Sequence, residues 1–183
     1  WPHVELGPHS GISIPGPWQV SFVAGGPVCP APLQRNELAP IAHLGDPELE
    51  RFAGTVRYET HFDLEKTPEA DRRLDLGAVR QSASVILNGV DLGVRVMAPF
   101  RFRVPAGVLV RRANHLVIEV ATLAANRIRD LDRRGVPWKV FHDINIVDND
   151  YRPFDASGWP VQEEGLLGPV QLSGPLLEAP MPL

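Results

Sequence analysis

The stretch LDLGAVRQSASVILNGVDLG, residues 74–93, decides the fold class of this chain. Its dipeptide Asn88-Gly89 suits a type I′ turn, because both central residues of that turn need a positive φ. In the arm before the turn, Ala83, Val85 and Leu87 recur at every second position and therefore share one face of a half-buried strand. The stretch predicts a β-hairpin of an all-β protein.

Other segments with the same alternation extend the prediction to a whole sandwich. The clearest are residues 18–22, 55–64, 100–104 and 115–122, and shorter strands are expected at 72–76 and 170–172. Many short strands separated by turn residues are typical of a two-sheet jelly-roll β-sandwich. Trp18 is expected in its core. The proline-rich stretch 25–47 shows little periodicity and is predicted to be loop.

The chain divides into three parts by composition. Residues 1–17 are predicted to be a leading segment or linker, residues 18–173 the β-sandwich domain, and residues 174–183 a proline-rich tail. The first residue is Trp1 rather than methionine, which indicates a piece of a longer product.

Composition excludes several classes of function. The net charge of -4 gives no general attraction to nucleic acid or to anionic membranes. No apolar run approaches the length of about 20 residues that a membrane helix needs. The single cysteine, Cys29, cannot form an intrachain disulfide, and the histidines are too scattered for a zinc motif. We therefore expect no binding to nucleic acid or to membranes; if the chain is a binding module, we also expect it to be a monomer.

Residues 123–168, called the excursion below, break the rhythm of strands. Residues 123–135 can form one short helix, with Gly135 just past its end. The rest is dense in aromatic, Asp and Asn side chains. A long irregular segment in a compact domain often carries a functional site, so we predict that the candidate site lies in the excursion.

Several segments together resemble a known family. They are FAGTVRYETHFDL (52–64), the hairpin at 74–93, PFRFRV (99–104), NHLVIEVATLAANRI (114–128) and GLLGPV (165–170). They resemble the sugar-binding jelly roll of glycoside hydrolase family 2, and more closely its version at the C-terminal end of bacterial family 106 α-L-rhamnosidase-like proteins.

The resemblance implies a galactose-binding-like domain attached to a catalytic module, in a protein that is extracellular or periplasmic. The catalytic carboxylates of such enzymes lie on the other module. The resemblance therefore assigns no catalytic residue to this chain, and fold alone does not settle its function.

Aromatic rings in the excursion are the first candidates for ligand binding. Flat rings can stack on the C–H faces of sugars, and Trp138, Tyr151 and Trp159 have polar neighbours that could bind hydroxyl groups. The polar members of this predicted set are Arg127, His142, Asp143 and Asp155. The alternative is that the rings pack the excursion together, which is the more frequent use of such residues and is expected for Phe141 and Phe154.

The same segment offers oxygen atoms for a Ca²⁺ ion. The candidate ligands are Asp143, Asn145, Asp148 and Asp150. However, the glycine and distal glutamate of the helix-loop-helix calcium motif are absent. Asp and Asn side chains that cap turns explain the pattern equally well, so calcium remains an alternative and no cofactor is required.

Catalysis by the chain itself has little support in the sequence. His142 and Asp143 are adjacent and would face opposite sides of a strand, so they would not form a base and its carboxylate partner. Ser157 lacks the G-x-S-x-G elbow of a nucleophile. No catalytic residue is therefore predicted.

Three functions remain open. The favoured one is a non-catalytic carbohydrate-binding module that is accessory to a larger glycoside hydrolase and binds plant or microbial oligo- or polysaccharides. The second is a structural module that packs on the catalytic module without binding sugar. The third is an autonomous glycan-active enzyme that uses loop carboxylates such as Asp143 or Asp150.

Overall fold

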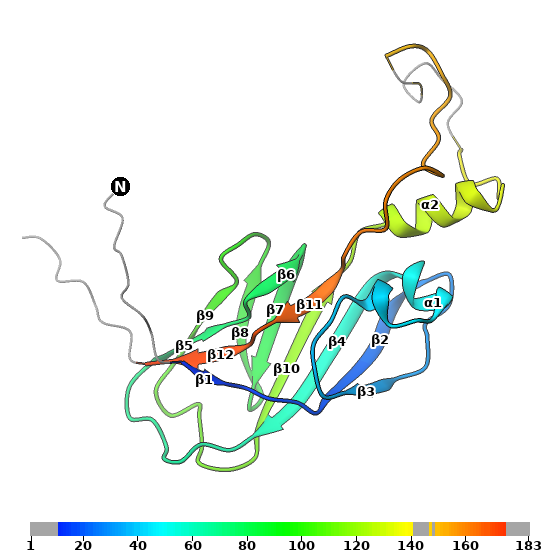
Figure 1. Ribbon diagram of the computed structural model, residues 1–183. Coiled ribbons are helices and arrows are strands. Elements are labelled where there is room, and N and C mark those ends of the chain that lie inside the picture. The colour runs from blue at the N-terminus through cyan, green and yellow to red at the C-terminus, as the bar shows by residue number, and fades with distance from the viewer. Residues whose placement is uncertain (1–10, 141–146, 148, 175–183) are drawn as a thin grey trace, which may run out of the picture.

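The chain folds into a β-sandwich from which one segment projects (Figure 1). This is a computed structural model, and it describes residues 11–140, 147 and 149–174. Apolar residues of the two main sheets form one continuous core between them. The predicted fold class is confirmed.

One layer is a six-stranded antiparallel sheet with the order β3-β2-β4-β10-β7-β8. Its strands are β2 (Trp18–Gly26), β3 (Leu33–Arg35), β4 (Ala53–Phe62), β7 (Ser82–Leu87), β8 (Val90–Arg95) and β10 (Asn114–Ala121). Trp18 is 2% exposed, as the sequence predicts for a core residue. Val85 and Ile118 face each other across β7 and β10 and are fully buried.

The opposite layer is a four-stranded sheet with the order β1-β12-β5-β9. It consists of β1 (Ile12–Ser13), β5 (Arg72–Asp75), β9 (Arg101–Val104) and β12 (Gln171–Ser173). A small two-stranded sheet joins β6 (Ala78–Arg80) to β11 (Gly165–Gly168). The helical elements are η1 (Ile41–His43), α1 (Pro47–Glu50) and α2 (Ala125–Arg133).

The predicted hairpin forms at β7 and β8. Asn88 and Gly89 have φ values of 51° and 79°, as a type I′ turn requires. The Asn88 side chain does more than permit the turn. Its Nδ2 donates to the Val108 carbonyl at 2.7 Å and to Asn114 Oδ1 at 2.9 Å, while its Oδ1 accepts from the His115 backbone N–H at 2.8 Å. The turn is thereby fixed to the start of β10.

Two glycines of the quoted motifs meet in space. Gly77 has a φ of 66°, and a Cβ atom there would lie 2.4 Å from the Gly168 carbonyl oxygen. The residues form a β-bridge where β6 joins β11. Any side chain at Gly77 would be strained in its backbone and blocked by Gly168. The glycine after LDL therefore allows β11 to lie against the segment that leads into the hairpin.

Some local predictions were wrong. The stretch 25–47 contains the end of β2, β3, η1 and the first residue of α1 rather than loop alone. Strands β6 and β11 were not predicted. Both are short and pair only with each other across a long sequence separation, so local alternation carries no signal for them.

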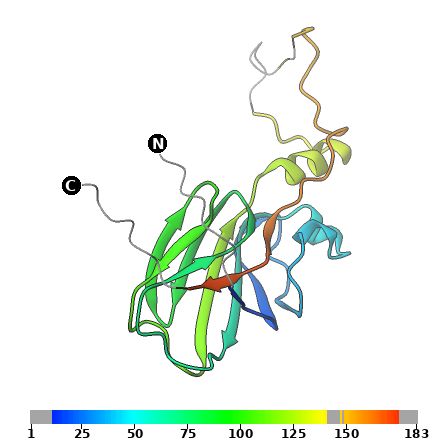
Figure 2. The same cartoon turned by 60° about the vertical axis from the view of Figure 1, so that its left-hand side comes forward.

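The excursion stands away from the sheets (Figures 1 and 2). The predicted short helix is confirmed as α2, and Gly135 follows its end with a φ of 64°. After α2 the chain extends outward and returns to the sandwich through β11. Residues 141–146 and 148, which the structure does not describe, fall within this segment.

Candidate functional site

Helix α2 ties the two ends of the excursion together. Asn126 is 2% exposed; its Nδ2 donates to the Gln162 carbonyl at 2.9 Å, and its Oδ1 accepts from the Gln162 N–H at 2.7 Å. Arg129 donates to the Trp159 carbonyl at 2.7 Å and to Glu50 Oε1 at 2.9 Å. The returning segment is thus fixed to α2, and α2 is fixed to α1.

Asp132, near the end of α2, organises the inner part of the excursion. Its carboxylate accepts from the Trp138 indole N–H at 2.6 Å and from the Ala156 backbone N–H at 2.8 Å, and Lys139 Nζ lies 3.3 Å away. Burial acts to raise the pKa of Asp132, but hydrogen bonds from Ala156, Trp138 and Lys139 outweigh it and lower that pKa. Asp132 is therefore ionised at neutral pH.

Three aromatic rings pack edge to face beside Asp132. The centroids of Trp138 and Phe154 are 6.0 Å apart, and those of Phe154 and Trp159 are 5.5 Å apart. Lys139 Nζ lies 5.6 Å from the Trp138 centroid and donates to the Phe154 carbonyl at 2.6 Å. Trp138 and Phe154 are used mainly inside this cluster, as the packing alternative predicts for Phe154.

Trp159 differs from the other two rings because it reaches the surface. It is 40% exposed and lines a cavity of about 490 Å³ together with Val147, Arg152, Pro153, Phe154 and Asp155. Trp138 lines a separate cavity of about 360 Å³. Tyr151 is 73% exposed with a φ of 60° and does not line either cavity.

The polar groups of the Trp159 cavity carry opposite charges. The Asp155 carboxylate accepts from the Ser157 backbone N–H at 2.8 Å, and this bond lowers the pKa of Asp155. Arg152 Nη2 bonds to Asp150 Oδ2 at 2.7 Å. A ring face, a carboxylate and a guanidinium around one opening can recognise a flat molecule that carries hydroxyl groups.

The structure does not bring every predicted site residue together. Arg127 lies on α2, where its Nη1 is buried without a hydrogen-bond partner among the described residues, and it does not line the Trp159 cavity. Predicted residues His142, Asp143, Asn145 and Asp148 lie outside the described residues. Of the predicted calcium ligands only Asp150 is described, and it pairs with Arg152.

No metal site is evident in the described part of the chain. Within residues 11–140, 147 and 149–174, no group of three or more His, Cys, Asp or Glu side chains is placed to hold a metal ion. In the same ranges, no helix is both long and apolar enough to cross a bilayer.

Sequence reasoning missed Asp132, Lys139 and Glu164. Asp132 and Lys139 look like ordinary charged residues in the sequence, and their role depends on contacts up to 24 residues away. Glu164 is 1% exposed, and neither carboxylate oxygen has a well-formed hydrogen bond in the described structure. Burial raises the pKa of Glu164 to about 7, opposed by the backbone N–H of Leu123. The neighbouring Glu163 is exposed. Two adjacent glutamates in a sequence do not indicate which of them is buried.

Comparison with known proteins finds similar segments within two larger glycosidases. A putative β-glucuronidase from Formosa agariphila is 29% identical over 182 aligned residues, covering 88% of this chain and 15% of that protein. The rhamnosidase from Novosphingobium sp. PP1Y superposes with a TM-score of 0.70 and 30% identity over 93% of this chain and 16% of its own. These similar proteins are glycosidases.

Other comparisons add information on the fold. The β-D-glucuronidase of Dictyoglomus thermophilum has a TM-score of 0.58 at 18% identity, covering 94% of this chain and 29% of its own, which shows a shared fold. No protein-family model matches the chain. The chain therefore spans about 15% of its similar curated relative and corresponds to a domain found in glycoside hydrolases.

Proposed function

We propose that this chain is a non-catalytic accessory domain of a larger glycoside hydrolase and that it binds oligo- or polysaccharide through its excursion. Support for the accessory role comes from the small share of each glycosidase that the chain matches, 15% and 16%. The location that suits such a protein is extracellular or periplasmic, where polymeric glycans are encountered. The catalytic module would lie in the same parent chain.

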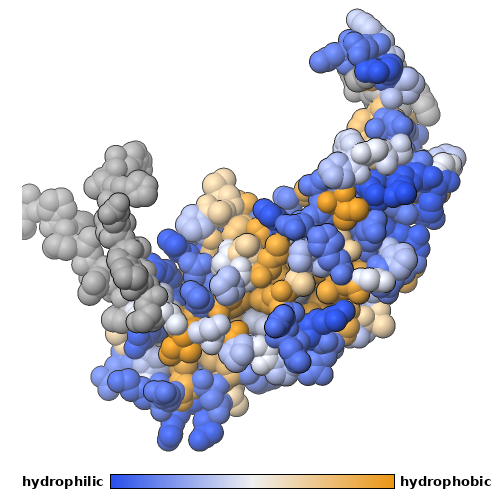
Figure 3. Space-filling view, viewed as in Figure 1, coloured by the Kyte–Doolittle hydropathy of each residue, from blue (hydrophilic) through white to orange (hydrophobic). Residues whose placement is uncertain are grey.

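The observation that carries the binding proposal is the cavity beside Trp159. The indole ring is held by Phe154, so it is already oriented before a ligand arrives. Asp155 and Arg152 stand at the same opening and can bind sugar hydroxyls. The excursion is also mostly hydrophilic on the face in Figure 3, while apolar residues gather over the sandwich.

Binding at this site would be weak and reversible. One ring contact contributes about 0.5–1.5 kcal/mol beyond its buried area, and each charge-assisted hydrogen bond about 1.5–3 kcal/mol before ordering costs. Affinity in the millimolar to micromolar range is therefore expected. Such binding would raise the local concentration of the catalytic module at a polymer.

A glycan array with and without a calcium chelator tests the proposal. We expect the isolated chain to bind at least one class of oligosaccharide. Loss of binding with chelator would show that calcium is needed. Failure to bind any glycan in either condition would reject the binding role.

A second candidate is packing against the catalytic module without sugar binding. It is favoured by apolar side chains exposed on the excursion, among which Val140 is 79% and Val136 is 36% exposed. An interface left uncovered should make the isolated chain self-associate. Sedimentation velocity separates the candidates, because a binding module should remain monomeric and an uncovered packing surface should form dimers or larger species.

A further inference from the structure

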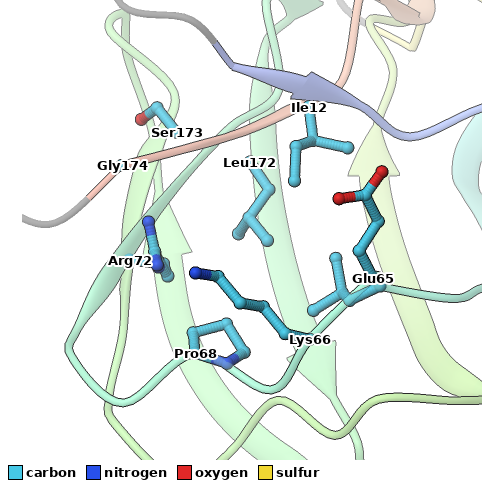
Figure 4. Close-up of a pocket in the computed structure, with 9 residues that line it drawn as sticks. Ile12, Glu65, Lys66, Pro68, Arg72, Leu172, Ser173 and Gly174 are labelled. Carbon is cyan, nitrogen blue, oxygen red and sulfur yellow. The ribbon is translucent and has the colours of Figure 1, made fainter.

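Another cavity lies at the opposite end of the molecule from the excursion. It has a volume of about 360 Å³ and opens between the four-stranded sheet and the segment after β4 (Figure 4). Its lining residues are Ile12, Leu64, Glu65, Lys66, Pro68, Arg72, Leu172, Ser173 and Gly174. The volume falls within the range of small-molecule sites.

The cavity has an apolar floor. Leu172 and Leu64 are 3% and 7% exposed, so they are fixed in the core, and Ile12 stands above them with 55% of its surface exposed. Ile12 and Leu172 are paired across β1 and β12, which fixes their spacing. Such a floor fits one apolar face of a ring and leaves the ring edge for polar contacts.

Two cations converge on one side of this floor. Figure 4 shows the Lys66 ammonium extended toward the Arg72 guanidinium, with the Glu65 carboxylate on the other side of the cavity. In the described structure neither cation has an ion pair, and the buried Arg72 Nε has no hydrogen-bond partner. By contrast, Arg101 and Arg103 on the neighbouring strand each bond to an aspartate.

An anion between Lys66 and Arg72 would relieve this arrangement. The two positive charges repel each other. An anionic group placed between them would replace this repulsion by attraction and would accept hydrogen bonds from both side chains. A planar carboxylate matches the guanidinium fork well. The apolar floor further favours an anion that belongs to a ring.

We propose that this cavity binds a sugar unit that carries a carboxylate, with the carboxylate between Lys66 and Arg72 and one ring face on Leu172 and Ile12. The site is independent of the Trp159 cavity and of the function proposed for it. The sandwich would then bind acidic sugar units of a glycan.

The chain allows a site-resolved test because Lys66 and Lys139 are its only lysines. Reductive ¹³C-methylation keeps both charges and gives each lysine an NMR signal, which Lys66→Arg and Lys139→Arg assign. The probes are sodium D-glucuronate, D-glucose and sodium acetate. Glucuronate and glucose differ at the carboxylate, and acetate lacks the ring.

Glucuronate should shift the Lys66 signal with at least about tenfold higher affinity than glucose or acetate, since charged hydrogen bonds and ring burial both contribute. The Lys139 signal should stay still. Arg72→Gln should weaken binding about tenfold. If that variant unfolds, isothermal titration of Lys66→Gln, altered only on an exposed loop, replaces it with the same expected loss.

Equal binding of glucose would overturn the carboxylate requirement, and equal binding of acetate would reduce the cavity to a general anion site. Binding only after removal of residues 175–183 would assign the cavity to the chain's own tail and reject the proposal. Trp159→Ala should leave the Lys66 response unchanged, so this result and the test of the Trp159 cavity can fail separately.

Discussion

At the scale of single residues, Asn88 has a role that its turn position does not reveal. The dipeptide Asn-Gly predicts a turn, whereas the structure adds three side-chain hydrogen bonds, two of them donated by Nδ2. The fully buried Asn114 is one partner and itself accepts from the Val110 N–H at 2.9 Å. The two asparagines together fix the hairpin to β10.

Replacing Asn88 by glycine separates the turn from this network. Glycine keeps the positive φ, so a residue that served the turn alone would be replaced at little cost. Because the Asn114 side chain would lose a partner, we expect Asn88→Gly to lower the free energy of unfolding by about 1–3 kcal/mol in urea titration. An unchanged midpoint would contradict the network.

Glu164 should make stability depend on pH. Its pKa is about 7 in the folded chain, whereas an unperturbed glutamate has a pKa of 4.5, so the folded state holds its proton more tightly. The contribution of Glu164 to the free energy of unfolding is therefore fully present below about pH 4.5. It is lost as the pH rises through about 7. Glu164→Gln should stabilise the chain by about 1–3 kcal/mol at pH 8 and have little effect at pH 4.

Urea unfolding at both pH values measures this difference. The matched control is Glu163→Gln, since Glu163 is the exposed neighbour that pairs with Arg80 at 3.1 Å. An exposed pair contributes little, so the control should change stability by less than about 1 kcal/mol at either pH. Equal effects of the two variants would show that Glu164 is not the titrating group.

At the scale of elements, the excursion is held together by Asp132. Its carboxylate is 7% exposed and joins α2 to Trp138, Lys139 and Ala156. Asp132→Ala should release Lys139 and speed cleavage by a lysine-specific protease there at least about tenfold, since local opening controls proteolysis. Cleavage at Lys66 supplies an internal reference that should not change.

A neighbouring carboxylate serves as the control for this variant. Asp130 lies on the same helix, and its ion-pair partners are Arg134 at 2.7 Å and Arg51 at 3.9 Å rather than Lys139. Asp130→Ala should leave the cleavage rate at Lys139 within about twofold of the parent, because an i,i+4 pair contributes only about 0.3–0.5 kcal/mol and the second partner, Arg51, is 3.9 Å away. Similar acceleration by both variants would assign the effect to α2 as a whole.

The elements differ in how well the sequence predicts them. Strands β4, β7 and β10 of the large sheet are predictable because one face is buried, so alternation is imposed on residues such as Val85 and Ile118. Strand β11 is not, because Gly165 and Gly168 serve close contacts rather than a face. The Asp132 cluster was also beyond prediction, since its partners extend to Ala156, 24 residues away in the sequence, and no local pattern brings them together.

At the scale of the whole molecule, the two proposed binding cavities lie on different parts, one on the excursion and one on the sandwich. The contact between Gly77 and Gly168 holds β11 against the segment that leads into the hairpin, and the excursion leaves the sandwich after β10 and returns at β11. The comparisons support the glycoside-hydrolase part of the predicted resemblance, because the chain matches a small part of two larger glycosidases. The proposed binding role now depends on Trp159 rather than on all three predicted rings.

The most direct test of that role is titration of the parent chain, Trp159→Ala and Tyr151→Ala with the oligosaccharide selected by the array. Tyr151 is the control because it is exposed in the same excursion but does not line the cavity. We predict that Trp159→Ala weakens binding at least about tenfold, as loss of a ring contact and its buried area implies, while Tyr151→Ala changes it less than about twofold. Unchanged affinity in Trp159→Ala would contradict the account.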